Sequence, residues 1–177
     1  MSKLNIAGVV ATAIMLSSGT LFAQTTGSCN ASHVRWASTS NTLYIAGPST
    51  CTLTNIRDIV SKKAPPIMQD AGNAAIWYLT ANLKLELGAK LVLHGTSMGG
   101  DVNELRIRSN NASTAGSTVY VRAQWGTIDI NNTKITSWDS AVNGPDTEYS
   151  TFKRSYIHVR SFLAADGVTP RESRMDI

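Results

Sequence analysis

The fold of this protein is indicated most clearly by residues 83–94, Leu83-Lys84-Leu85-Glu86-Leu87-Gly88-Ala89-Lys90-Leu91-Val92-Leu93-His94. Leucines recur at every second position on both sides of Gly88-Ala89, with charged residues between or beside them, and this period of two is typical of half-buried β-strands. Glycine tolerates the left-handed backbone of a sharp corner. The stretch therefore predicts two short strands joined by a tight turn.

Further alternating runs follow, and they occupy residues 104–108, 119–122, 127–130, 156–160 and 174–177. The inward positions Leu85, Ile107 and Ile130 are 22 and 23 residues apart, and Ile157 follows 27 residues later. Such a spacing resembles a coil repeat, in which each coil covers the apolar interior of its neighbour. We predict an all-β fold, a right-handed parallel β-helix of about four coils. The alternative is a β-sandwich with antiparallel pairing.

The chain divides into a leader, a cap and the coils. Residues 24–72 are irregular in pattern and are expected to form an N-terminal cap, with one helix over 55–63. Residues 73–177 are expected to form the coils. The last strand, 174–177, has no polar capping segment after it, so we expect this chain to be truncated at its C-terminus, with further coils in the natural protein.

Residues 1–23 have the pattern of a secretory signal peptide, with Lys3 near the start, an apolar core and Ala23 at the expected cleavage site. The alternative is a membrane anchor, because the apolar stretch approaches the roughly 20 residues that span a bilayer. Ser17 to Thr20 interrupt it, which favours cleavage. We expect an extracellular or periplasmic protein with no membrane contact after cleavage.

Composition narrows the class of protein. The 177 residues carry 42% hydrophobic and 16% charged side chains with a formal net charge of +4, which excludes a disordered chain and a large multidomain enzyme. Lysines and arginines are spread along the chain, so no nucleic-acid partner is expected. In an oxidising compartment Cys29 and Cys51 are expected to form a disulfide rather than two free thiols. Three sequons, at Asn30, Asn111 and Asn131, are glycosylation sites if the host is a eukaryote.

Four stretches of the sequence resemble a known family. They are Gly126-Thr127-Ile128-Asp129-Ile130, Ile135-Thr136-Ser137-Trp138-Asp139, Pro145-Asp146-Thr147 and Ser173-Arg174-Met175-Asp176-Ile177. From about residue 75 onward the chain resembles the early coils of right-handed β-helix proteins similar to mannuronan (alginate) epimerases. The resemblance implies a polyuronate ligand on an outer sheet and inversion at carbon 5 of mannuronate. The family's Asp-Pro-His-Asp motif is absent, because none of His33, His94 and His158 follows an Asp-Pro pair. Enzymatic activity is therefore left open.

One strand carries the best set of candidate catalytic side chains. Tyr156, His158 and Arg160 alternate with apolar residues, so they should share an outward face. Proton abstraction beside a carboxylate needs a base, an acid and a cation, and these residue types supply them. We expect earlier coils to add ligand-binding residues to one cationic strip, namely Lys84, Arg106, Arg108 and Arg122, together with Asp129. The alternative is an ordinary solvated sheet face.

The sequence patterns that suggest other ligand-binding residues are less specific. Trp138 is the tryptophan that we expect to stack on a sugar ring, the alternative being half-buried packing. Asp139, Asp146 and Glu148 could hold calcium, but their spacing fits no EF-hand, and an irregular polar loop hydrogen-bonded to itself is the favoured alternative. No cofactor or metal is otherwise expected. The motifs of serine hydrolases, zinc proteases and nucleotide-binding enzymes are absent from the sequence.

The sequence thus predicts a secreted β-helix protein related to alginate- or pectate-modifying proteins, which binds acidic polysaccharide and lacks the catalytic coils. The alternative is a non-enzymatic secreted or surface interaction protein, resembling an adhesin or effector. Binding that weakens with salt would favour the first function.

Overall fold

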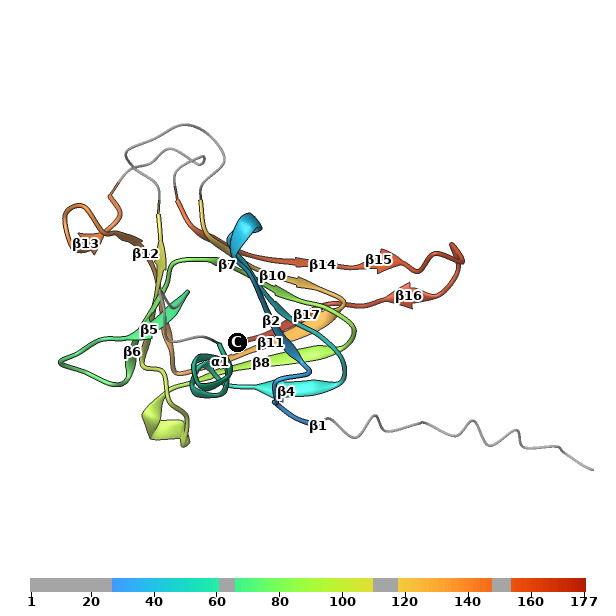
Figure 1. Cartoon of the computed structure of the whole chain (residues 1–177), viewed down its shortest axis with the longest axis horizontal. Coiled ribbons are helices and arrows are strands. Elements are labelled where there is room, and N and C mark those ends of the chain that lie inside the picture. Colours follow the sequence, from blue (N-terminus) through green and yellow to red (C-terminus); the bar gives the residue numbers. More distant parts are fainter. Residues whose placement is uncertain (1–26, 61–65, 110–117, 148–153) are drawn as a thin grey trace, which may run out of the picture.

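The structure is a computed structural model, and it describes residues 27–60, 66–109, 118–147 and 154–177 (Figure 1). The predicted signal peptide therefore lies outside the described residues. Nearly all the regular structure consists of short strands, which confirms the predicted all-β class. In the described part of the chain no helix is long and apolar enough to cross a membrane.

Within the described residues, fifteen of the strands form three five-stranded sheets. In spatial order, sheet A contains β1 (Gly27–Ser28), β4 (Ser49–Cys51), β8 (Ala89–His94), β11 (Gly126–Asn131) and β17 (Arg174–Asp176). Sheet B contains β14 (Tyr156–Arg160), β10 (Tyr120–Gln124), β7 (Asn82–Leu85), β3 (Thr42–Ile45) and β2 (Val34–Ala37). Sheet C contains β13 (Gly144–Pro145), β12 (Lys134–Asp139), β9 (Glu104–Arg108), β6 (Ile76–Leu79) and β5 (Ile67–Gln69).

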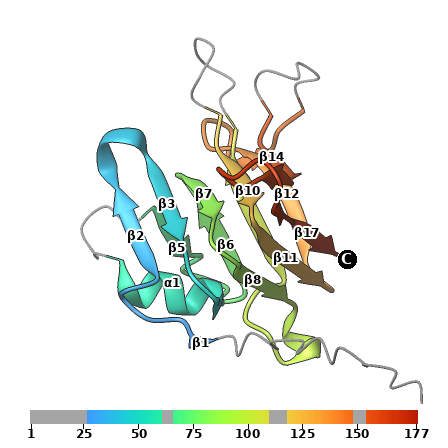
Figure 2. The same ribbon diagram turned by 90° about the vertical axis from the view of Figure 1, so that its right-hand side faces the viewer.

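The chain visits the three sheets in turn. From β7 in sheet B it passes to β8 in sheet A and β9 in sheet C, and then repeats this order through β10, β11 and β12. Successive strands of one sheet pair in parallel, as β7 does with β10 and β8 with β11. Figure 2 shows β2, β3, β7, β10 and β14 side by side. This parallel pairing is what the sequence predicted, in contrast to the antiparallel pairing of a sandwich.

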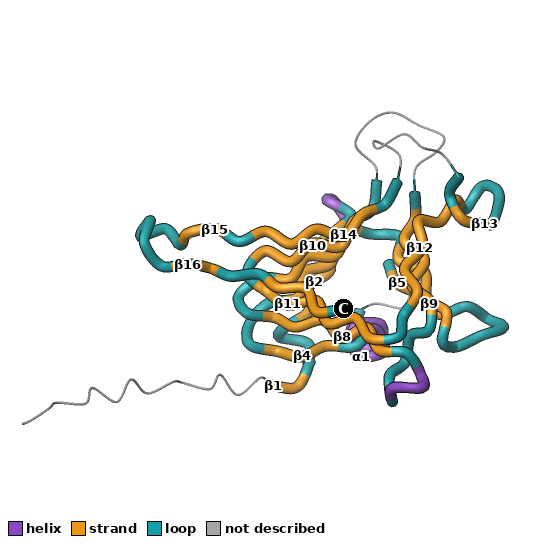
Figure 3. Tube along the Cα trace, turned by 180° about the vertical axis from the view of Figure 1, so that it is seen from behind, coloured by secondary structure: helices purple, strands orange, loops and turns teal. Residues whose placement is uncertain are grey.

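Antiparallel strands lie at three of the sheet edges. β2 pairs antiparallel with β3 at one edge of sheet B, and β5 does so with β6 in sheet C. At the opposite edge of sheet C, β13 is antiparallel to β12. A separate hairpin of β15 (Phe162–Leu163) and β16 (Pro170–Arg171) extends away from the sheets (Figure 3).

The core lies between the three sheets. β7, β8 and β9 each bury every second side chain, so that Leu83 and Leu85 of β7 face the same interior as Leu91 of β8 and Leu105 of β9. These leucines are at most 1% exposed, and fully burying one such side chain stabilises the fold by roughly 1.5–3 kcal/mol. The alternation in the sequence therefore explains why the inner face of each sheet is apolar and buried.

The predicted coil repeat is wrong, although the strands that it joined are real. Leu85 lies in sheet B, Ile107 in sheet C and Ile130 in sheet A, so the spacing of 22 and 23 residues connects neighbouring sheets rather than stacked coils. The residue paired with Leu85 on the neighbouring strand of sheet B is Ala123, and Ile157 is paired with Val121. One coil is consequently longer than the predicted repeat.

The predicted helix over 55–63 is displaced. The helix α1 spans Leu53–Ile59, because Thr52 and Asn55 form a reciprocal capping box that starts it two residues earlier. Leu53 and Ile56 are fully buried in the core. Residues 61–65, where the prediction ended, lie outside the described residues. Two short 3-10 helices, η1 (Ser38–Ser40) and η2 (Thr96–Met98), complete the structure.

Candidate functional site

The three candidate catalytic residues lie on β14, as the alternation predicts. Tyr156, His158 and Arg160 are exposed on the outer face of sheet B, while Ile157 and Val159 pack against the core. β14 pairs with β10 along its whole length, with Tyr156 opposite Tyr120, His158 opposite Arg122 and Arg160 opposite Gln124.

A row of side chains crosses all five strands of sheet B at the level of His158. Arg35 is opposite Tyr44, Tyr44 is opposite Lys84, Lys84 is opposite Arg122, and Arg122 is opposite His158. We call Arg35, Tyr44, Lys84, Arg122 and His158 the cationic row. Because in-register parallel strands place equivalent residues side by side, the row is a direct product of the strand register.

Aromatic rings separate the charges of the cationic row. The guanidinium carbon of Arg35 lies 4.0 Å from the centre of the Tyr44 ring, and the Lys84 ammonium lies 5.4 Å from it. Arg122 lies 4.7 Å from the centre of the Tyr120 ring, which stacks on Tyr156 at 5.5 Å. Each contact is within the range of a cation–π or stacking interaction.

The cationic row has no acidic partner within the described ranges. No carboxylate there lies at ion-pair distance from Arg35, Lys84, Arg122 or His158, and the Nε atom of Arg122 is buried without a hydrogen-bond acceptor. A buried donor without an acceptor costs roughly 1–3 kcal/mol. The face therefore has unbalanced positive charge and at least one unused donor.

Sheet A differs, because its cations are paired. Asp129 accepts a hydrogen bond from Lys90 at 2.6 Å and lies 3.0 Å from His94 Nε2, and Arg174 pairs with Asp176. Partial burial raises the pKa of Asp129, but the hydrogen bonds from Lys90 and His94 outweigh it and the pKa is lowered. The expectation that Asp129 belongs to the strip of Lys84 and Arg122 is wrong, because β11 lies in sheet A.

Sheet C holds the remaining candidates. Arg106, Arg108 and Trp138 lie on the outer face of β9 and β12, so the single strip predicted from the sequence is divided between two sheets. Arg106 lies 3.9 Å from the centre of the Trp138 ring and donates to Glu104 at 3.1 Å. Trp138 is only 8% exposed, so packing accounts for most of its surface.

Glu104 is the centre of the charge network on sheet C. It accepts hydrogen bonds from Arg106 and Thr136 and forms an ion pair with Lys134 at 3.3 Å. Burial raises the pKa of Glu104, but these donors outweigh that effect and lower it. Sheets A and C thus neutralise most of their outward cations, and sheet B does not.

The predicted calcium ligands do not gather. Asp139 accepts from the backbone of Ala141 at 2.8 Å, Asp146 is buried beside Ser137, and Glu148 lies outside the described residues. Among the residues that the structure describes, no group of three or more His, Cys, Asp or Glu side chains could hold a metal ion.

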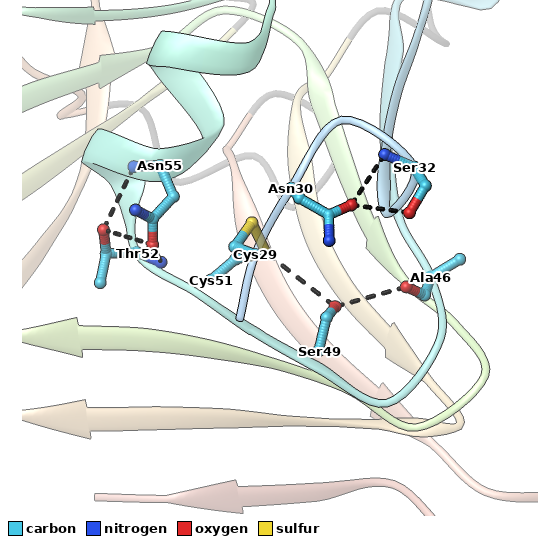
Figure 4. The surroundings of a disulfide bond; sticks show 8 residues. All are labelled: Cys29, Asn30, Ser32, Ala46, Ser49, Cys51, Thr52 and Asn55. Atoms are coloured by element: carbon cyan, nitrogen blue, oxygen red, sulfur yellow. Dashed lines mark hydrogen bonds between the residues drawn. A yellow bond between two sulfur atoms is a disulfide. The ribbon is translucent and has the colours of Figure 1, made fainter. Parts of the chain in front are cut away.

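The disulfide is confirmed. Cys29 and Cys51 are bonded, with their Cα atoms 4.9 Å apart, and the bond joins the segment after β1 to the end of β4 (Figure 4). The neighbouring sequon at Asn30 is exposed, and Asn30 accepts hydrogen bonds from Ser32. At the sequon of Asn131, the Thr133 hydroxyl lies 2.7 Å from the Val102 carbonyl oxygen. Asn111 lies outside the described residues.

Sequence reasoning missed Arg35, Tyr44 and Tyr120 as members of the site. Tyr44 lies in the alternating run Leu43-Tyr44-Ile45, which signals a strand, but residues 24–72 were expected to form an irregular cap. The parallel register of β3 on β7 places Tyr44 beside Lys84. That pairing joins residues far apart in sequence, so periodicity alone could not reveal it.

Comparisons with known proteins concern the fold. No protein-family model matches the chain, and no curated protein is similar to it in sequence. Among solved structures it is similar to the crystal structure of the periplasmic alginate epimerase AlgG, with a TM-score of 0.50 and 12% sequence identity. The likeness covers 67% of this chain and 24% of the AlgG chain, so this chain spans about a quarter of that protein's length. At this identity the similarity is one of fold.

Proposed function

We propose that this protein is a secreted, right-handed parallel β-helix protein, related to alginate-modifying proteins, that binds acidic polysaccharide on the outer face of sheet B. The observation that carries the proposal is the cationic row. It is a line of positive side chains and aromatic rings that crosses five strands without an acidic partner among the described residues.

The repeated order of sheets B, A and C supports the β-helix. Two consecutive passes, β7 to β9 and β10 to β12, stack in parallel register in all three sheets. Connections between parallel strands are right-handed in about 98% of cases, which supports the proposed hand. The likeness to AlgG supports the same fold. In this proposal residues 24–72 start the helix and residues 73–177 continue it.

Secretion is supported by two features of the chain. Residues 1–23 have the composition of a signal peptide, and the Cys29–Cys51 disulfide is of the kind that persists in oxidising compartments. The proposed location is extracellular or periplasmic, where acidic polysaccharides are accessible.

The spacing of the charges suits an extended polyanion. Neighbouring strands lie about 4.8 Å apart, so Lys84, Arg122 and His158 present donors at regular intervals across the sheet. Arginine can bind a carboxylate with two parallel hydrogen bonds. A uronate chain crossing the strands would meet a side chain that can donate a hydrogen bond at each of these three strands, two of them cationic.

Aromatic side chains beside the row support a sugar ligand rather than a simple anion. Tyr156 is 43% exposed and stacks on Tyr120, so one face of the pair is open to a ring. Apolar faces of pyranose rings pack on such aromatic surfaces in the same way that aliphatic groups do. The row supplies charge recognition, and the tyrosine pair supplies contact area.

Binding, rather than inversion at carbon 5, is the role that we propose for Tyr156, His158 and Arg160. All three side chains are exposed to solvent. Proton abstraction from carbon requires groups held in a site that excludes water, where electrostatic stabilisation is strong. We therefore expect no carbon-5 proton exchange when mannuronan is incubated with the protein in deuterated water and followed by NMR.

Calorimetric titration of the purified protein tests the function. Alginate and polygalacturonate should bind, neutral dextran should not, and the affinity should fall as sodium chloride screens the charges. Replacing both Lys84 and Arg122 by glutamine should weaken binding about tenfold, which corresponds to about 1.4 kcal/mol.

Lys134→Gln removes one positive charge from the outer face of sheet C, and it is the matched control for the single variant Lys84→Gln. It should leave polyuronate binding unchanged. An equal loss in Lys134→Gln would show that net charge, rather than the cationic row, attracts the polymer. Absence of binding to either polyuronate would disprove the proposed function.

A further inference from the structure

Two tyrosine rings lie stacked on the outer face of sheet B. Tyr120 of β10 and Tyr156 of β14 are paired in the parallel register of the two strands. Their ring centres are 5.5 Å apart and the ring planes are inclined by 21°, which is a stacked arrangement. Because in-register strands hold equivalent residues side by side, the backbone pairing keeps the two rings together.

The other tyrosines in the described part of the chain have different surroundings. Tyr78 contacts the ring of Trp138 edge to face, with 76° between the ring planes. Tyr44 contacts the cations Arg35 and Lys84, and no aromatic ring among the described residues. Within the described ranges, the stacked pair is therefore the place where two phenol rings lie face to face.

The stacked pair is accessible to reagents in solution. Tyr156 is 43% exposed, and β14 is the last strand of sheet B among the described residues. Neither phenol hydroxyl of the pair is held by a hydrogen bond to the part of the chain that the structure describes. An oxidant can therefore reach the O–H group of Tyr156 without any opening of the fold.

Stacked phenols have the geometry that radical coupling requires. A one-electron oxidant removes a hydrogen atom from a phenol, and the unpaired electron of the radical spreads to the ring carbons beside the C–O carbon. It occupies π orbitals perpendicular to the ring, so two stacked rings present these orbitals to each other. Because the strands hold the rings in place, the coupling is an intramolecular step with a high effective concentration.

We propose that Tyr120 and Tyr156 are an oxidative cross-linking site, at which hydrogen peroxide, acting through a haem peroxidase, joins the two rings as dityrosine. Each phenol loses the hydrogen atom of its O–H group, and one ortho carbon of each ring bonds to the other. The hydrogen atoms of these two carbons then move to the two oxygens. The peroxide accepts the two hydrogen atoms that were removed and becomes two molecules of water.

The cross-link would fix the end of sheet B. Among the described residues β14 pairs with β10 on one side and with no strand on the other. An edge strand of this kind can open locally or pair with another chain. A carbon–carbon bond between side chains on the outer face leaves the backbone pairing intact and holds β14 against β10. The oxidising surroundings that the reaction needs are those in which the Cys29–Cys51 disulfide persists.

Peptide mapping after oxidation tests the site. The purified protein, in dilute solution, is treated with a haem peroxidase and hydrogen peroxide and then digested with trypsin, which cuts after Arg108, Arg122, Arg154 and Arg160. Tyr120 and Tyr156 are then the only tyrosines in peptides 109–122 and 155–160. Mass spectrometry should find these two peptides joined and two hydrogen atoms lighter than their sum, with the blue fluorescence of dityrosine.

Tyr120→Phe and Tyr156→Phe should each abolish the joined peptide, because phenylalanine keeps the ring but has no O–H hydrogen to lose. Tyr44→Phe is the matched control on the same face of sheet B, and it should leave the yield unchanged. Unfolding the protein in urea before oxidation, with the peroxidase activity checked in the same urea, should lower the yield, because the strands no longer hold the rings together.

Four results would overturn the proposal. One is the absence of the joined peptide although the same enzyme couples free tyrosine. A second is cross-linking between chains alone, seen as a dimer on a denaturing gel. A third is coupling through peptide 135–153, which contains Tyr149, in place of 155–160. The fourth is an equal yield from folded and unfolded protein. None of these measurements involves polysaccharide, so the site and the proposed function are tested independently.

Discussion

The backbone N–H of Gly88 donates a hydrogen bond to the carbonyl oxygen of Trp125 at 2.8 Å, which joins the corner between β7 and β8 to the corner between β10 and β11. Both corners connect sheet B to sheet A and both require a left-handed backbone. In the first corner Leu87 has φ 56° and Gly88 has φ 83°, and in the second Trp125 has φ 66°. Equivalent corners are therefore built with different residues.

Leu87→Gly should stabilise the protein by about 0.5 kcal/mol, because it removes the strain of a left-handed leucine at the expense of backbone entropy. Leu87 is 50% exposed, so little packing is lost. Trp125→Gly should instead destabilise by about 1 kcal/mol, because its ring packs 4.0 Å from the Arg171 guanidinium. Urea denaturation measures the change in the free energy of unfolding for each of the two variants. Equal effects of the two substitutions would contradict this assignment of strain and packing.

Gly100→Ala should destabilise by about 3 kcal/mol or more, because a Cβ atom there would lie 2.0 Å from the His94 carbonyl oxygen. Gly99→Ala is the matched control. Its Cβ would meet nothing within 4 Å, so it should cost only about 1 kcal/mol from its left-handed φ of 74°. Thermal unfolding of both variants checks the difference, and a Gly100→Ala protein as stable as Gly99→Ala would refute the close approach.

Asp129→Asn should change how stability depends on pH. The pKa of Asp129 is lowered in the fold from its ordinary value of 3.8, so its ionised form stabilises the protein above that pH. This contribution is lost as the pH falls below about 4 and through the lowered pKa. The parent should therefore lose more stability than Asp129→Asn between pH 5 and pH 2. Parallel curves of unfolding free energy for the two proteins would exclude a role for the Lys90 and His94 contacts.

Replacing Cys29 and Cys51 by alanine should lower the free energy of unfolding by about 3 kcal/mol, as expected for a loop of 22 residues. Cys51 is fully buried, so the single variant Cys51→Ala under reducing conditions measures the packing part alone. Denaturation of the oxidised and the reduced parent gives the contribution of the bond. If reduction left the midpoint unchanged, the disulfide would have no stabilising role.

The local features of the fold were predictable because they depend on neighbouring residues. Alternation located the strands, glycine located the corner at Gly88, and the presence of two cysteines predicted the disulfide. The outward face of β14 followed from the same period of two.

The assignment of strands to sheets was not predictable from periodicity. Alternation shows which side of a strand faces the core, but the inward residues of all three sheets have the same pattern. The corner between sheets A and C also varies in length, with two residues between β11 and β12 but a longer segment, including η2, between β8 and β9. Leu85 and Ile107 therefore resembled repeats of one position, and Arg106 resembled a neighbour of Arg122.

The antiparallel strands at one edge of sheets B and C give the fold a direction of assembly. β2 and β3 form a local hairpin, whose closing loop is short and whose formation is correspondingly fast. β7 then pairs with β3, β10 with β7 and β14 with β10. Each of these strands therefore pairs with a strand that precedes it in the sequence. The order of addition along sheet B is the order of the sequence, so this chain can assemble progressively from its N-terminal hairpin.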